Sequence, residues 1–410
     1  MPNPNPNPNL FVEAHILQSL PPSNINRDDS GTPKQAQYGG ARRARVSSQA
    51  WKRATRMEYA RAEPACDRAT RTKRIAALLS DRLAQPAADG GAALEAAQAS
   101  RLAAALLEPL GISKSTKKDD HSAYLLFFGK RQLDAVIGLL DGRAADLSAL
   151  PDKELKAEID TLPVVSALAT GHPAEVALFG RMVADLKDLN VDAAVQVAHA
   201  LSTHAVRTEF DYYTAVDDEN VEDSGAGMIG TVEFNSSTLY RYAVLGVHQL
   251  RDNLTSPEAT RDAAVRFVDA FTRSMPTGHQ NTFAHRTLPH LVLITVRTDQ
   301  PVNLVSAYEE PVTGHAGLAA ESAARLAREL KEVGETWGTV PSRTLATYAL
   351  EGDKLSESFG PSLPFPALLA SVGDLVATWL ATGEITAAIP AQATAGAAAT
   401  TVDVTAGAVE

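Results

Sequence analysis

The sequence predicts an α+β fold whose strands and helices follow the order βαββαβ, with large insertions between them. Two observations lead to this prediction. Strand patterns lie near both ends of the stretch 10–298 and as a pair in its middle, and a helical pattern precedes and follows that pair. The 410 residues can bury one large core or two modest ones, and we expect one core with insertions. The expected sheet belongs to the RNA-recognition-motif (ferredoxin-like) class.

The first predicted strand is the apolar run LFVEAHIL at residues 10–17, followed by a turn-rich stretch long enough to be a functional loop. Next comes the strongly basic stretch at residues 38–56, which has six cations and no acid. Gly39 and Gly40 permit a turn or a close approach of the backbone. An extended run with three arginines follows, namely Arg42, Arg43 and Arg45.

A helix is expected to begin at this point, because the hydroxyl of Ser47 or Ser48 can cap it. Lys52 and Arg56 lie four residues apart and share one helical face, with Arg53 beside them. Open backbone N–H groups at a helix start favour an anion by roughly 0.3–1 kcal/mol and point at a phosphate. We interpret this stretch as a phosphate-backbone cradle for single-stranded RNA. The alternative is a solvated basic face paired with acids from elsewhere in the chain.

The net charge of -11 argues against a nucleic-acid partner only until it is divided along the chain. Residues 34–74 carry twelve cations and three acids, a net charge of +9, which leaves -20 for the remainder. A basic segment on an acidic body can hold a polyanion locally while the body discourages nonspecific adsorption. The same segment can also hold an acidic neighbouring copy of the chain.

Targeting and redox features favour a cytoplasmic protein. The single cysteine, Cys66, rules out an internal disulfide and a thiolate cluster for zinc. Residues 1–9 lack the cationic start and apolar centre of a signal peptide and form an expected disordered leader. No apolar run approaches the ~18 residues of a membrane span, so no membrane contact is expected. From residue 387 the composition predicts a disordered tail.

Residues 64–172 are expected to form a helical insertion. Alanine-rich helical patterns cover roughly 67–84 and 92–108, AYLLFF at 123–128 predicts a buried strand, and helices are expected near 130–140 and 152–160. After Pro173 the patterns EVALFGRM and VQVAHALSTHAV predict strands of the central sheet, although the second also suits a helix.

The acidic, glycine-rich residues 209–231 predict a projecting loop or hairpin, after which TVEFNSSTLYRYAVLGV resumes a strand pattern. A helix is expected at 256–275 and a strand at 290–298. A helix near 316–336, a strand near 343–350 and a helix near 365–381 complete the body, which ends at residue 386. Between the insertion and the hairpin, residues 173–208 return to the sheet.

The sequence also contains patterns that occur in catalytic sites. Gly225–Gly230 has the spacing of a dinucleotide-binding turn but lacks the strand and helix that such a turn needs. Asp217 and four neighbouring acids have the oxygen ligands that Mg²⁺ takes in phosphodiester cleavage, and a solvated loop needs fewer assumptions. His15 is a candidate general acid–base of a metal-free RNA endonuclease. His199 and His204 lack a third metal ligand at suitable spacing.

Aromatic residues near the expected hairpin have two interpretations each. Tyr212 and Tyr213 can stack on unpaired bases, at ~1–3 kcal/mol per base, or pack as half-buried core residues. Tyr240 and Tyr242 alternate on one strand face, which favours cross-strand packing over a base platform. Phe234 has the same ambiguity.

Several motifs occur in the order found in one known family. They are NRDD (Asn26–Asp29), YGGARRARVSSQAWKR (Tyr38–Arg53), FGRM (Phe179–Met182), YYTAVDD (Tyr212–Asp218), GTVEF, LYRYA and HQNTFA (His279–Ala284). On these motifs the sequence resembles the CasC backbone-subunit family of the type I-E CRISPR Cascade, from about residue 10 to 300. The resemblance implies a right-hand shape with a palm, a helical fingers insertion and a thumb hairpin.

The resemblance also implies a function without catalysis, cofactor or metal. Copies of such a subunit polymerise along CRISPR guide RNA and contact other Cascade subunits. Each thumb kinks the guide, and the remaining bases stay free to pair with target DNA. Cleavage belongs to a recruited helicase-nuclease. An RNA endonuclease acting on the guide precursor is the alternative function.

The resemblance assigns roles to particular residues. The expected guide-phosphate contacts are Ser47, Gln49, Lys52, Arg53 and Arg56, with Arg42, Arg43 and Arg45 along the same path. The expected wedge near the kinked nucleotide consists of Met182, Tyr212 and Tyr213. Further expected RNA contacts are Arg27, Gln280 and Asn281. Ala41 and His279 stand where the family often has lysine, so the grip is expected to be weaker or pH-dependent there.

Overall fold

The computed structural model describes residues 9–86, 93–111, 125–183, 186–215, 228–314, 317–350 and 353–385. Its centre is an antiparallel sheet with the strand order β11-β10-β1-β9-β7-β3-β2, in which β6 and β8 also pair with β9. The long first strand, β1 (Phe11–Ser23), lies between β9 (Met228–Gly246) and β10 (Leu291–Arg297). It therefore extends well beyond the predicted strand at 10–17.

The order of elements around this sheet is the predicted βαββαβ. After β1 come α1 (Ser48–Arg61), the short collinear strands β6 (Val195–Val197) and β7 (Ala200–Ser202), β9, α10 (Pro257–Arg273) and β10. Both short strands pair with β9 and act as one interrupted strand. The RNA-recognition-motif-like α+β fold is confirmed, and we call the sheet with its packed helices the palm.

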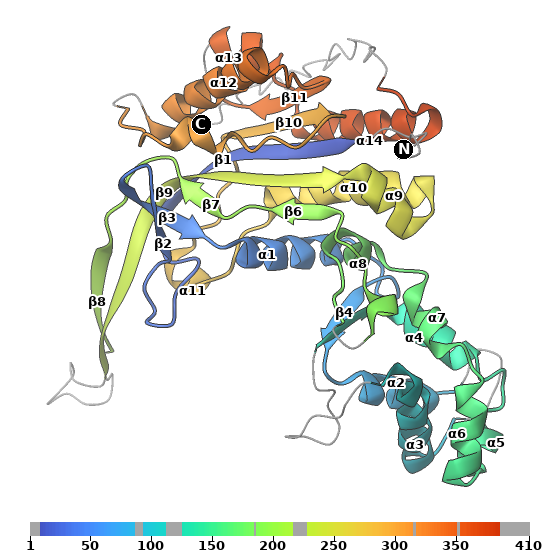
Figure 1. Cartoon of the computed structure of the whole chain (residues 1–410). Helices are drawn as coiled ribbons and strands as arrows, with labels where there is room; N and C mark the ends of the chain where they lie inside the picture. Colours follow the sequence, from blue (N-terminus) through green and yellow to red (C-terminus); the bar gives the residue numbers. More distant parts are fainter. Residues whose placement is uncertain are drawn as a thin grey trace, which may run out of the picture.

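Alternation along β1 divides the palm into layers. Val12, Ala14 and Ile16 point into a core shared with α10 and α14 (Phe365–Thr382). Leu17 points to the opposite face, into a core shared with α12 (Leu318–Trp337). Because side chains of a strand alternate between its two faces, one strand serves both cores. Helices thus cover both faces of the sheet (Figure 1).

Helix α14 contradicts the expectation that no apolar run approaches the length of a membrane span. Among the described residues it is the one helix long and apolar enough, by length and composition, to cross a membrane. Its Leu368, Val372 and Trp379 are buried against the same core as α10. The apolar face of α14 is therefore covered by the palm itself.

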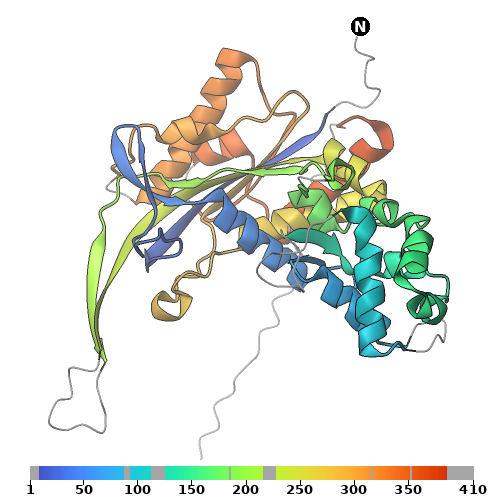
Figure 2. The same cartoon turned by 60° about the horizontal axis from the view of Figure 1, so that its bottom comes forward.

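The elements from β4 to α7, which lie within the predicted insertion at 64–172, form an arm that hangs from the palm (Figure 1, Figure 2). The arm has a core of its own, built by Leu79, Leu102, Val136 and their neighbours. Its elements are β4 (Ala69–Thr72), α2 (Ile75–Leu83), α3 (Ala96–Leu107), η1 (Glu108–Leu110), β5 (Leu126–Gly129), α4 (Lys130–Gly138), α5 (Ala144–Ala149), α6 (Asp152–Asp160) and α7 (Val164–Ala169).

Two predicted elements near the arm are wrong. Residues 69–72 form the strand β4, paired with β5, instead of the start of a helix. The run EVALF lies in the helix α8 (Ala174–Phe179), in which the four consecutive residues from Glu175 to Leu178 are buried. Short apolar runs do not distinguish a buried strand from a buried helix. The other predicted strands and helices are present.

The remaining elements complete the palm. The basic arginine run is β3 (Ala41–Val46), which forms a hairpin with β2 (Gln35–Tyr38). The projecting hairpin pairs β8 (Glu209–Ala215) with the start of β9, with Tyr212 opposite Thr231. Its expected acidic tip, with Asp217 and the first half of the Gly225–Gly230 motif, lies outside the described residues, which resume at Met228, and residues 1–8 and 386–410 also lie outside them. Elsewhere lie η2 (Lys187–Leu189), α9 (Val247–Leu254), α11 (Gln280–Phe283), η3 (Leu304–Tyr308), β11 (Arg343–Tyr348) and α13 (Asp353–Phe359).

Candidate nucleic-acid interface

Side chains from three segments fix the start of α1. Ser47 is its N-cap, and the Ser47 Oγ accepts a hydrogen bond from the Ala50 N–H (3.4 Å). The Ser47 N–H itself donates to Asn26 Oδ1 (2.8 Å), and the Ser48 N–H donates to His199 Nδ1 (3.2 Å). The expectation of open N–H groups is therefore wrong for Ser48 and Ala50. Ser47, expected at a phosphate, is buried and uses its hydroxyl to cap the helix.

Outward-facing polar side chains continue from β3 onto α1. They are Arg42, Arg45, Gln49, Lys52, Arg53 and Arg56, each at least partly exposed. The Arg42 guanidinium donates to Gln35 Oε1 (3.1 Å), and the Arg45 guanidinium lies 3.3 Å from His199 Nδ1. Within the described ranges, the three helix cations form no ion pair with an acid. A row of unpaired cations on a protein of net charge -11 has free capacity for a polyanion. Among the described residues, the chain's own acids therefore do not neutralise this face of α1.

Arg43, expected on the RNA path, is instead buried. Its guanidinium donates to the carbonyl oxygens of Ser202 (3.0 Å), Tyr308 (2.7 Å) and Glu309 (3.0 Å). Side chains alternate along β3, so Arg42 and Arg43 point to opposite faces, and the packing of Tyr308 and Glu309 against the Arg43 face buries this arginine. Arg43 therefore positions the hairpin that carries the outward arginine.

A second group of residues expected to contact RNA lies together where the NRDD and HQNTFA motifs come into contact. The Arg27 guanidinium lies 2.7 Å from His279 Nε2, which joins the NRDD motif to the HQNTFA motif. Gln280 and Asn281 follow on α11 and are exposed. Burial, and then the charge of Arg27, lowers the pKa of His279, so this histidine is neutral at pH 7. His279 thus supplies no cation where a lysine was expected by resemblance.

The expected wedge residues are strongly exposed. Met182 is 85% exposed, Tyr212 63% and Tyr213 41%, which excludes the interpretation of the two tyrosines as core residues. Phe210, which sequence reasoning missed, is 67% exposed and lies on the same hairpin face as Tyr212. Tyr213 lies on the opposite face, over Gly230, where any Cβ would meet the ring. Strand alternation from Tyr212 would have identified Phe210.

The other aromatic residues behave as packing groups. Tyr240 and Tyr242 are buried beside His15 in the core under α12. Phe234 packs on Phe283, with 5.8 Å between ring centroids. The predicted cross-strand packing of the two tyrosines is confirmed.

The wedge residues do not meet within one chain. Met182 follows α8, which lies at one end of α1, whereas the β8–β9 hairpin projects beyond the other end (Figure 1, Figure 2). The exposed position of Met182 is fixed by its neighbour Arg181, which donates to the carbonyl oxygens of Phe127 (3.3 Å) and Leu168 (3.0 Å).

His15, the candidate general acid–base, is wrong as a catalytic residue. It is fully buried, and its ring nitrogens lie 2.8 Å from Tyr240 Oη and 3.2 Å from Thr295 Oγ1. Burial lowers the pKa of His15 to about 4. No substrate reaches this site without opening the core. Among the described residues no group of three acids, histidines or cysteines is placed to hold a metal ion.

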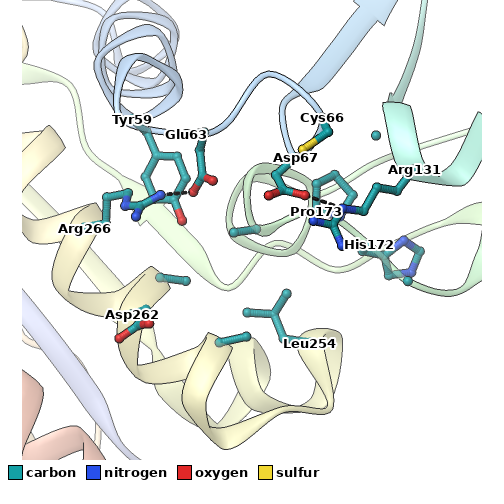
Figure 3. Close-up of a pocket in the computed structure, with 15 residues that line it drawn as sticks. Tyr59, Glu63, Cys66, Asp67, Arg131, His172, Pro173, Leu254, Asp262 and Arg266 are labelled. Atoms are coloured by element: carbon teal, nitrogen blue, oxygen red, sulfur yellow. Dashed lines mark hydrogen bonds and ion pairs between the residues drawn. The ribbon is translucent and has the colours of Figure 1, made fainter.

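A cavity of about 510 Å³ lies where the arm meets the palm (Figure 3). Two ion pairs line it, Glu63 with Arg266 on the palm side and Asp67 with Arg131 on the arm side. Because acids and guanidiniums are matched within the cavity, it lacks the unpaired positive charge of α1. Its lining therefore favours a polyanion less than the cations of α1 do.

An RNA-recognition-motif-like sheet flanked by unpaired cations and exposed aromatic side chains defines a nucleic-acid-binding class of protein. The chain belongs to the CT1975-like protein family, whose model matches residues 12–361. It is also similar to solved chains. One, described as "CRISPR RNA-guided surveillance complex, pre-nicking", is 31% identical with a TM-score of 0.75, and the match covers 89% of this chain and 99% of that one. A second, described as "CRISPR RNA-guided surveillance complex", is 27% identical with a TM-score of 0.67 and the same coverage. No curated protein sequence matched.

Proposed function

We propose that this protein binds CRISPR guide RNA as the backbone subunit of a surveillance complex of the type I-E kind. The observation that carries the proposal is the row of unpaired cations on α1. Lys52, Arg53 and Arg56 project from one helix and have no acid partner in the described part of the chain. The two similar solved chains come from RNA-guided surveillance complexes, and this similarity favours guide RNA as the polyanion that these cations bind.

The separation of the wedge residues supports a polymer of copies along the guide. Tyr212 on the hairpin and Met182 beside α8 lie at opposite ends of α1. A hairpin that projects from one copy reaches the Met182 end of the next copy, and the RNA runs along α1 between them. Such a repeat leaves most guide bases free to pair with target DNA. The other subunits of the complex complete the assembly.

The proposed role is binding without catalysis. His15 is enclosed by the core, and the exposed interface consists of cations, amides and aromatic rings instead of an acid–base pair. Cleavage of target DNA is then the task of another component, and the protein works in the cytoplasm, where guide RNA is found.

The test removes two positive charges with the double variant Lys52→Ala and Arg53→Ala. The affinity for single-stranded RNA is then measured as a function of salt concentration. If each copy neutralises about 3–6 phosphates, the log-log slope is about -2 to -4 for the native protein. The double variant is expected to reduce the magnitude of that slope by about 1.4. A matched control is Arg328→Ala with Lys331→Ala, which removes two exposed helical cations from α12. An unchanged slope in the first variant contradicts the proposal.

A further inference from the structure

One further cationic site lies where α1 meets the arm. The guanidinium carbon of Arg56 lies 5.2 Å from the ring centroid of Phe127, and that of Arg71 lies 5.0 Å from the same centroid. Arg56 comes from α1 of the palm, Arg71 from β4 and Phe127 from β5 of the arm. Phe127 is buried, Arg56 is half-buried and Arg71 is exposed. Two cations from different parts of the molecule therefore contact one aromatic ring.

The two guanidiniums are not neutralised by the protein. Neither forms an ion pair within 4.0 Å among the described residues. The acid that acts on Arg56 is Glu175, which is buried and whose Oε2 accepts the Ala69 N–H at 2.7 Å. Burial, and then the charge of Arg71, lowers the pKa of Arg56. Two like charges near one ring repel each other, and a bound anion reduces that repulsion.

The site is held in place before any ligand arrives. The Ala69 N–H bond to Glu175 fixes β4 on α8, and the Arg181 guanidinium donates to the Phe127 carbonyl oxygen (3.3 Å). Phe127 also packs on Val176 of α8. Since these contacts join the arm to the palm, the spacing of the two arginines is set by the fold instead of by two free side chains.

The position of the two arginines at the end of the α1 cations indicates which kind of anion they would bind. Arg56 continues the face of Lys52 one turn further along α1, about 12 Å from the helix start. Strand β4 begins the arm just beyond that end of the helix (Figure 1). A strand of nucleic acid that follows the cations of α1 from β3 therefore arrives at Arg71. Paired guanidiniums bind phosphate groups with directed hydrogen bonds.

We propose that Arg56 and Arg71, held over Phe127, form a phosphodiester-binding site at the root of the arm. This inference rests on the proposed function and extends the interface from the palm onto the arm. The phosphodiester belongs either to the guide RNA or to a DNA strand paired with it. Both backbones consist of phosphodiesters, and the experiment distinguishes binding of the guide RNA from binding of the DNA strand.

The experiment compares Arg71→Ala, Arg71→Lys and a matched control, Lys153→Ala, which removes one exposed cation from α6 at the far end of the arm. Binding is measured first with a labelled single-stranded RNA and the free protein. It is then measured with a complementary single-stranded DNA added to the protein–RNA assembly. Thermal unfolding of each variant checks the fold.

We expect Arg71→Ala to weaken one of the two steps about three- to tenfold and to reduce the magnitude of its salt slope by about 0.7. Arg71→Lys retains the slope, because it retains the charge, and Lys153→Ala changes neither step. An effect on the RNA step assigns the site to the guide, and an effect on the DNA step assigns it to the target strand. Unchanged binding in both steps by Arg71→Ala, with the native protein binding RNA, overturns this inference alone. Failure of the native protein to bind RNA overturns the proposed function and this inference together.

Discussion

The Arg43 guanidinium donates a 2.7 Å hydrogen bond to the carbonyl oxygen of Tyr308, although 265 residues separate the two in the sequence. The bond ties the β2–β3 hairpin to η3. Two further contacts support the same joint, since Tyr38 Oη donates to the Val305 carbonyl oxygen (3.2 Å) and the Gly39 backbone lies against Glu309. The surface that carries Arg42 and Arg45 is thus positioned by a buried member of the same arginine run.

Arg43→Ala is expected to destabilise the protein by about 3 kcal/mol or more, because several buried carbonyl oxygens lose their donor. Arg43→Lys recovers only part of this loss, since one ammonium group lacks the planar spread of donors. Urea unfolding measures both. Arg42→Ala is the matched control and is expected to leave stability within about 0.5 kcal/mol while weakening RNA binding. Equal stability of the Arg43→Ala and Arg42→Ala variants would exclude the anchoring role.

Gly39→Ala is expected to release the hairpin from η3. A Cβ at Gly39, whose φ is +55°, would lie 1.5 Å from the Glu309 carbonyl oxygen, so the backbone must move. Gly40→Ala is the control, because Gly40 has a similar φ of +73° but open space around it, and it carries only the left-handed backbone cost of about 1–2 kcal/mol. Thermal unfolding and RNA binding of the two variants are compared. Similar behaviour of both variants would contradict the close docking of Gly39.

Stability is expected to fall as the pH drops from 7 to 5, in part because of His15. Its folded-state pKa of about 4 lies below the ordinary value of 6.5, so the unfolded chain takes up the proton first. This histidine accounts for about 2 kcal/mol of the loss over that interval. Burial likewise lowers the pKa of the half-buried His172, which adds to the trend.

The variant His15→Gln isolates the contribution of His15. The difference in unfolding free energy between the native protein and this variant is expected to shrink by about 2 kcal/mol from pH 7 to pH 5. Urea unfolding at both pH values measures it. A difference that stays constant would show that His15 titrates normally in the folded protein.

Tyr212→Ala is expected to weaken binding of single-stranded RNA by about 1–3 kcal/mol in assemblies of several copies. Since the ring is 63% exposed, folding stability is expected to change by no more than about 0.5 kcal/mol. The control is Trp337→Ala on α12, an aromatic side chain that is 76% exposed and distant from α1. Equal binding by the two variants would remove the hairpin from the interface.

Local patterns in the sequence were sufficient for the order of the elements and for the main cationic surface. The period of β1, the Ser47 cap and the four-residue spacing of Lys52 and Arg56 depend on near neighbours in the chain, so they can be read without a partner segment. The length of EVALF was too short to separate strand from helix, and α8 was mistaken for a strand for that reason.

Tertiary structure alone decided which of these residues are available to a ligand. Arg43 and Arg42 are chemically identical neighbours, and only the packing of η3 against the hairpin buries the first and leaves the second in solvent. The pairing of Arg56 with Arg71 across Phe127 likewise depends on β4, β5 and α1 meeting at the root of the arm. Sequence by itself determined the fold class and the charge, whose causes are local. Burial and partnership depend on segments far apart in the chain, so the tertiary structure determined the site.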